Sequence, residues 1–190
     1  GGVTFTSIAS SRDAALRSTA GDVQQGSGAI TARNLVVRAD GLVSLSGANA
    51  VSALSGSAGS SSGTAFVYRD VDSFNLNGSV TTPGGLTLTS DAGAITQSAG
   101  TITAGTLNAT AVHGITLNQA NNFGSIGTVS NTGAGGVTLT DANGLNVTGG
   151  ITAIGQTATL TATTGRVEQT GGAIVAESLN ASGTTGINLG

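Results

Sequence analysis

Cysteine, methionine, tryptophan and lysine are absent from the chain, and proline occurs once, at Pro83. Without cysteine the chain can form neither a disulfide framework nor a thiolate metal site. Aromatic residues make up 3% and charged residues 8% of the 190 residues, so the bulky side chains of an ordinary globular core are missing. No stretch approaches the roughly 18 consecutive apolar residues of a membrane-spanning helix, and we expect no membrane insertion.

Charge and acid–base groups are also sparse. The six basic residues are all arginine, and nine carboxylates bring the net charge to −3, which gives no electrostatic basis for binding nucleic acid. His113 is the only histidine, and Asp70 and Asp72 are the only closely spaced pair of carboxylates. Acid–base catalysis and calcium binding both need such groups to converge, so we expect no enzyme, no metal site and no cofactor.

What the chain does contain is a short alternating pattern. The stretch from Leu86 to Thr106 holds three runs, LTLT, AITQ and TITA, separated by Ser, Asp, Ala and Gly. Each run places apolar residues on one face, as a short half-buried strand does, and none has helical spacing. We interpret this stretch as one rung of a solenoid.

The rung recurs along the whole chain. Rungs begin near Ala14, Leu35, Ala65, Leu86, Leu107, Val137, Ala158 and Leu179. The spacing of successive starts follows the order 21, 30, 21, and these three rungs form a 72-residue superrepeat. A fixed period of this kind predicts an all-β, right-handed parallel β-helix with three short strands per rung and about eight rungs. We expect residues 1–190 to be a single β-helix segment and a fragment of a longer repeat protein.

The longer rungs each carry an insertion. The first is the Gly/Ser-rich stretch 55–63, which predicts a surface loop, and the second lies within 127–136. The strand pattern near the first places Val36, Arg38, Phe66 and Tyr68 on the outer face. One hypothesis is therefore a module that binds a glycan or a protein through these four residues and the 55–63 loop. The alternative is that the loop or a neighbouring segment covers them.

The C-terminal rungs carry Thr-x-Thr on the predicted outer face. The threonines are Thr87, Thr89, Thr138, Thr140, Thr159 and Thr161. Regular threonine hydroxyls on a flat sheet suggest an ice-binding surface. The alternative is that threonine stands here because it is favoured on the outer face of strands.

The rungs LTLTSDAGAITQSAGTITAGTLNATA, VTLTDANGLNVTGGITA and ATLTATTGRVEQTGGAIVAESLNAS are similar to the repeat regions of filamentous haemagglutinin-like exoproteins. Those are large bacterial adhesins exported by two-partner secretion, and their amino-terminal secretion domain has no counterpart in these residues. The resemblance implies a secreted or cell-surface bacterial protein with a host-cell or surface glycan or protein as partner. Lateral association of such rods is an option that the sequence leaves open. It implies no site residues. Our leading hypothesis is a structural stalk or spacer without catalysis.

Overall fold

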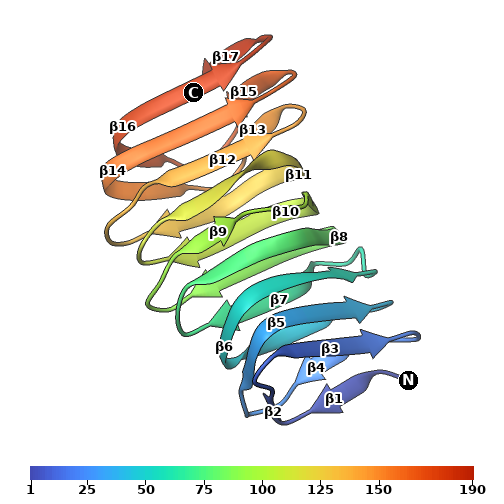
Figure 1. Cartoon of the computed structure of the whole chain (residues 1–190). Coiled ribbons are helices and arrows are strands. Elements are labelled where there is room, and N and C mark those ends of the chain that lie inside the picture. Colours follow the sequence, from blue (N-terminus) through green and yellow to red (C-terminus); the bar gives the residue numbers. More distant parts are fainter.

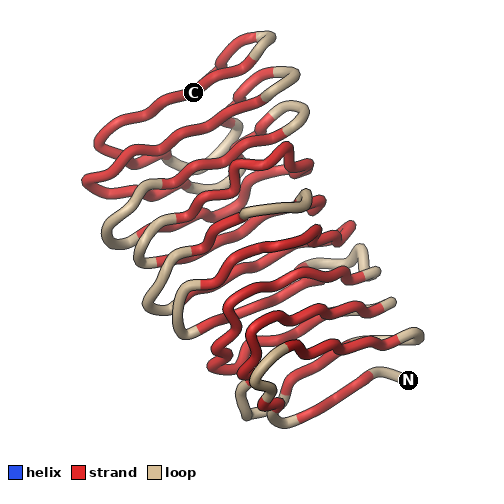
Figure 2. The backbone as a smooth tube through the Cα atoms, viewed as in Figure 1, coloured by secondary structure: helices blue, strands red, loops and turns tan.

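The computed structural model describes all 190 residues, which form short and long strands joined by turns, without a helix (Figure 2). No helix of the length and apolar character needed to cross a membrane is therefore present. The strands are β1 (Val3–Phe5), β2 (Ile8–Ala9), β3 (Asp13–Ser18), β4 (Val23–Gln25), β5 (Ile30–Ala39), β6 (Val43–Ala58), β7 (Thr64–Asp70), β8 (Phe74–Ser90), β9 (Ile95–Gln97), β10 (Ile102–Ala111), β11 (Ile115–Asn131), β12 (Val137–Asp141), β13 (Leu145–Val147), β14 (Ile151–Ala162), β15 (Arg166–Gln169), β16 (Ile174–Gly183) and β17 (Gly186–Leu189).

The strands form a parallel β-solenoid of about nine coils, where a coil is one complete circuit of the backbone. Every strand pairing is parallel, and each strand pairs with a segment one circuit further along the chain, as Leu86 does with Leu107. The coils follow one another along a single axis, so the two termini lie at opposite ends (Figure 1). This confirms the predicted all-β parallel β-helix.

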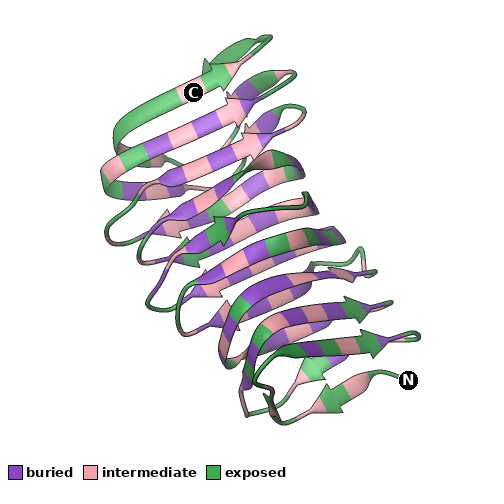
Figure 3. Ribbon diagram, in the orientation of Figure 1, coloured by how far each residue is buried: buried purple, intermediate pink, exposed green.

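The core is a narrow column that runs the length of the solenoid. Buried and partly exposed residues alternate along nearly every strand because successive side chains point to opposite faces (Figure 3). The inward residues join in one cluster of 41 buried residues from Ala14 to Val167. A single coil could not bury these side chains, so stability depends on stacking each coil against its neighbours.

The predicted loop at 55–63 is wrong for its first four residues and confirmed for the remaining five. Leu35 of β5 already pairs with Leu54 of β6, so the chain has completed a coil before this stretch begins. Residues 55–58 continue β6, and Ala58 is buried. Only residues 59–63 form a loop, between β6 and β7. The second predicted insertion behaves in the same way, because its first part, 127–131, belongs to β11.

The superrepeat and the coil have different lengths. Successive pairings lead in three steps through Ala14, Leu35, Leu54 and Leu76. Leu76 lies on β8, which also contains Phe74. From Phe74, four further pairings lead through Ile95, Ile115 and Val137 to Ala158. Seven coils thus separate Ala14 from Ala158, which are two superrepeats apart, so one superrepeat spans three and a half coils. Equivalent residues of successive superrepeats therefore lie half a circuit apart around the axis.

Candidate functional site

The predicted outward placement of Phe66 and Tyr68 is wrong, because both side chains are fully buried. They face inward from β7, where they pair with Leu86 and Leu88 of the next coil. The pairing shifts between Thr64 and Phe66, which leaves Ala65 as an additional residue. One additional residue moves every following side chain to the opposite face of a strand.

Tyr68 belongs to a buried cluster that joins two neighbouring coils. Its ring packs edge-on against Phe74, with 5.0 Å between ring centroids and 77° between planes. Its hydroxyl donates a 2.5 Å hydrogen bond to Asp70 Oδ2, which also accepts the Val51 N–H at 2.8 Å. Burial raises the pKa of the Asp70 carboxyl above its ordinary value, although these hydrogen bonds act in the opposite direction. Burial, with the neighbouring Asp70 charge, also raises the pKa of Tyr68.

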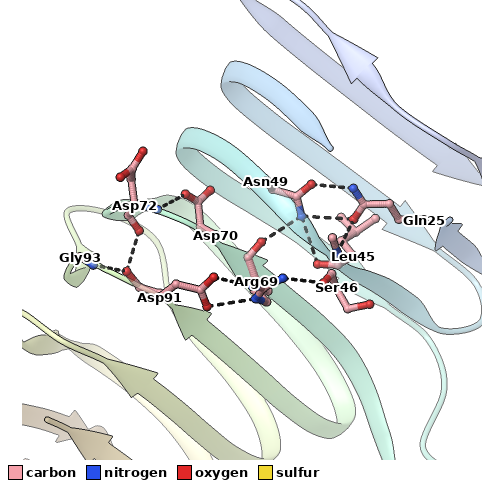
Figure 4. A network of polar contacts seen from close by, with 11 residues as sticks. Gln25, Leu45, Ser46, Asn49, Arg69, Asp70, Asp72, Asp91 and Gly93 are labelled. Atoms are coloured by element: carbon pink, nitrogen blue, oxygen red, sulfur yellow. Dashed lines mark hydrogen bonds and ion pairs between the residues drawn. The ribbon is translucent and has the colours of Figure 1, made fainter. Parts of the chain in front are cut away.

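The same shift turns Arg69 outward. Its guanidinium makes a bidentate ion pair with Asp91 of the next coil, from Nε to Oδ1 at 3.0 Å and from Nη2 to Oδ2 at 2.6 Å (Figure 4). The hydrogen bonds and charge of Asp91 raise the pKa of Arg69. The pair lies at the surface, where such contacts stabilise a fold only weakly. Arg69 therefore links two coils and offers no free charge to a ligand.

Buried and partly buried polar side chains form hydrogen bonds at the corners of the coil. Gln25 Nε2 donates to Asn49 Oδ1 at 2.7 Å, and Asn49 Nδ2 donates back to Gln25 Oε1 at 3.2 Å (Figure 4). Asn49 Oδ1 also accepts the buried Ile30 N–H at 2.8 Å, and Nδ2 donates to the carbonyl oxygens of Leu45 and Arg69. The two amides thus connect three successive coils at one corner.

An equivalent network recurs one superrepeat later. Gln97 Nε2 donates to Asn121 Oδ1 at 2.8 Å, and Asn121 Nδ2 donates to Gln97 Oε1 at 3.1 Å. Asn121 Oδ1 accepts the Ile102 N–H, as Asn49 does that of Ile30. These amides are absent from the predicted site residues, although the recurrence of Gln and Asn at the superrepeat period is a sequence signal for them. No buried side-chain nitrogen or oxygen in the chain lacks a hydrogen bond.

Two residues of the predicted partner surface do lie on the outer face, and one of them, Arg38, borders a polar cavity. Val36 and Arg38 point outward from β5, as predicted, with Val36 half-buried and Arg38 exposed. Arg38 forms one wall of a cavity of about 440 Å³ on the outer surface of the sheet. The other lining residues are Ser55, Gly56, Ser57, Gly78, Ser79 and Thr81. We call this cavity the Arg38 groove.

The six predicted ice-binding threonines do not form one array. All six point outward and are partly exposed. Thr138 and Thr140 pair with Thr159 and Thr161 in a block of two by two. Thr87 and Thr89 pair instead with Asn108 and Thr110, on a different strand column. The half-circuit offset of the superrepeat separates the two groups.

The column through Thr138 nevertheless contains two threonines that the sequence analysis omitted. Thr96 pairs with Thr116, Thr116 with Thr138, and Thr138 with Thr159, so four threonines follow one another over four coils. Asn180 of the next coil ends this series.

Comparison with known proteins gives one family match. A model described as repeats of unknown function (DUF5649) matches residues 62–130, a length close to one superrepeat. No curated protein and no solved structure matches the chain. The match and the solenoid are consistent with a structural repeat module.

Proposed function

We propose that this chain is a rigid spacer in the stalk of a large bacterial adhesin that is secreted or displayed on the outer cell surface. The observation that carries the proposal is the uninterrupted stacking of coils. Each coil from β3 onward is hydrogen-bonded to the preceding one, and the apolar column inside continues without a break from Ala14 to Val167. Such a solenoid has a length set by its number of coils, and bending it would require breaking strand ladders.

The polar corners support the same role. The Gln–Asn networks and the Arg69–Asp91 ion pair each connect neighbouring coils, so side-chain contacts reinforce the backbone ladders that join the coils along the axis. An adhesin stalk needs stiffness along its axis in order to hold a binding region away from the cell. The similarity of the rungs to adhesin repeats is the reason for placing the spacer in such a protein.

The spacer proposal is tested by the dimensions of the chain in solution. With about nine coils at ~4.8 Å each, small-angle scattering should give a stiff rod with an axis of about 40 Å. A flexible or expanded scattering profile would contradict a rigid spacer.

The cellular part of the proposal needs a separate test. Antibodies raised against this chain should label intact cells of the source bacterium, and protease added outside the cells should remove that labelling. Labelling only after the cells are lysed would exclude an adhesin stalk and leave the spacer role untouched.

A further inference from the structure

The Arg38 groove follows from the pairing of three strands. Arg38 of β5 pairs with Ser57 of β6, and Ser57 pairs with Thr81 of β8. Neighbouring strands lie ~4.8 Å apart, so the arginine and the threonine stand on either side of a serine. The short side chains of Ser55 and Ser57 on the middle strand, with Gly78 of β8 beside them, leave space between these two walls.

The polar groups of the groove are largely unused by the chain itself. The two ion pairs of the protein join Arg33 with Asp13 and Arg69 with Asp91, and neither involves Arg38. The hydroxyls of Ser55, Ser57 and Thr81 make no hydrogen bond within the chain, whereas Ser79 Oγ accepts the Thr101 N–H at 3.2 Å. Four of the lining side chains therefore keep their hydrogen-bonding capacity for a ligand.

Glycine 78 keeps the groove open. A Cβ atom at this position would lie 3.1 Å from the Ser55 Cβ and 3.5 Å from its Oγ, so any larger side chain would reach toward the lining serine. Beside it, Asn77 Nδ2 donates a 3.2 Å hydrogen bond to Asn34 Oδ1, which joins β8 to β5 across the intervening strand. This contact adds a side-chain link between the two strands that form the walls, whose spacing is set by their ladders with β6.

We propose that the Arg38 groove binds a carboxylate-bearing sugar residue of an acidic glycan. A guanidinium presents parallel N–H groups that match a planar carboxylate in bidentate geometry. Serine and threonine hydroxyls both donate and accept, as sugar hydroxyls require. The groove has no apolar lining residue, which disfavours an apolar ligand, and its volume is typical of small-molecule sites.

The charge of the surroundings restricts the ligand further. Arg38 is the only charged residue of the groove, and the chain as a whole carries a net charge of −3. Beyond the groove, exposed Arg17 is the residue that pairs with Arg38, so a densely charged polyanion would meet these two favourable charges in an otherwise unfavourable overall field. One carboxylate per sugar residue suits the single arginine better.

The test is an NMR titration of the whole chain with trigalacturonate as the probe. Amide resonances of Arg38, Ser57 and Thr81 should shift together and saturate, and the neutral sugar galactotriose should leave them in place. Shifts of equal size with galactotriose, or with inorganic sulfate at equal concentration, would overturn the proposal, as would no shift in the groove.

Matched variants test whether the charge of Arg38 is responsible for trigalacturonate binding. Arg38→Gln keeps the stem and removes the charge, and we expect it to weaken trigalacturonate binding by about tenfold or more. Thr81→Val should weaken it less. Arg17→Gln is the control, because Arg17 pairs with Arg38 in the next coil, is exposed and does not line the groove. Equal losses for Arg17→Gln and Arg38→Gln would show general charge attraction and contradict the groove.

Discussion

Asn49 and Asn121 hold equivalent hydrogen-bond networks half a circuit apart around the solenoid axis. Asn49 bonds Gln25 and accepts the backbone N–H of Ile30, and Asn121 bonds Gln97 and accepts that of Ile102. The two asparagines are one superrepeat apart, and the superrepeat spans three and a half coils. The sequence repeat therefore keeps the same hydrogen-bond network at a corner, but places successive copies of that corner on opposite sides of the solenoid.

The glutamines of these networks allow a direct comparison. Gln97 makes hydrogen bonds with Asn121 and Gly100, whereas Gln169 bonds only Gly172 and is partly exposed. Gln97→Ala removes the two hydrogen bonds that Asn121 makes with the glutamine inside the core, and it should lower the free energy of unfolding by about 2–3 kcal/mol. Gln169→Ala should cost less than about 1 kcal/mol, and urea denaturation of the two variants measures the difference. Equal costs would show that the buried network contributes nothing.

The position of Leu88 tests the core register. Leu88 is fully buried and pairs with Tyr68 and Ala109 of the neighbouring coils. Leu88→Asp places an unpaired charge in the column, and we expect a loss of more than about 4 kcal/mol with separation of adjacent coils. The matched substitution Thr87→Asp changes the adjacent outward residue and should cost little. Thermal unfolding of Leu88→Asp at the wild-type temperature would refute the register.

The shift at Ala65 is tested by truncating two adjacent residues. Tyr68 is buried against Phe74, whereas Val67 points outward and is only half-buried. Tyr68→Ala should lower the free energy of unfolding by about 3–5 kcal/mol, as for other buried aromatic residues. Val67→Ala should lower it by less than about 1 kcal/mol. A larger loss for Val67→Ala than for Tyr68→Ala would contradict the inward orientation of Tyr68.

Asp70 gives the stability a defined pH dependence. Burial raises its pKa in the folded state, so the folded chain holds the proton more tightly than the unfolded chain does. Its contribution is therefore largest below the ordinary aspartate pKa of about 3.9 and is lost as pH rises through the raised value. Burial also raises the pKa of Asp141, which adds to this trend.

We expect the free energy of unfolding to decline from about pH 4 toward neutrality, and Asp70→Asn to reduce that decline. Urea midpoints at several pH values measure both slopes, with Asp40→Asn as an exposed control. A wild-type stability that increases over this range, with the same slope in Asp70→Asn, would contradict the assignment.

One superrepeat spans three and a half coils, so duplicating a superrepeat should move the residues that follow it to the opposite side of the solenoid. Inserting a second copy of residues 86–157 after Thr157 adds three and a half coils, or about 17 Å of length. Spin labels at Thr96 and Thr159 lie on the same column about 14 Å apart in the native chain. In the insertion variant they should lie on opposite sides and more than about 30 Å apart. A distance that fits two labels on one side would refute the half-circuit offset.

Several features of this protein were legible in its sequence. Period-two apolar runs, glycine-rich turns and the 72-residue recurrence predicted parallel stacking and most of the core, including Leu35, Leu86 and Leu139, because side-chain alternation is a local property of strands. The outward orientation of Arg38 followed from the same alternation.

Other features were decided only by the tertiary structure. A single additional residue at Ala65 turned Phe66 and Tyr68 inward, and the assignment of residues 55–58 to a strand depended on a neighbouring coil to pair with. The Arg38 groove and the separation of the threonines also arise between coils. Sequence periodicity specifies which residues alternate, but the number of residues in each circuit determines which of them become neighbours, and that number is set by the closure of the coil and by the packing of its corners.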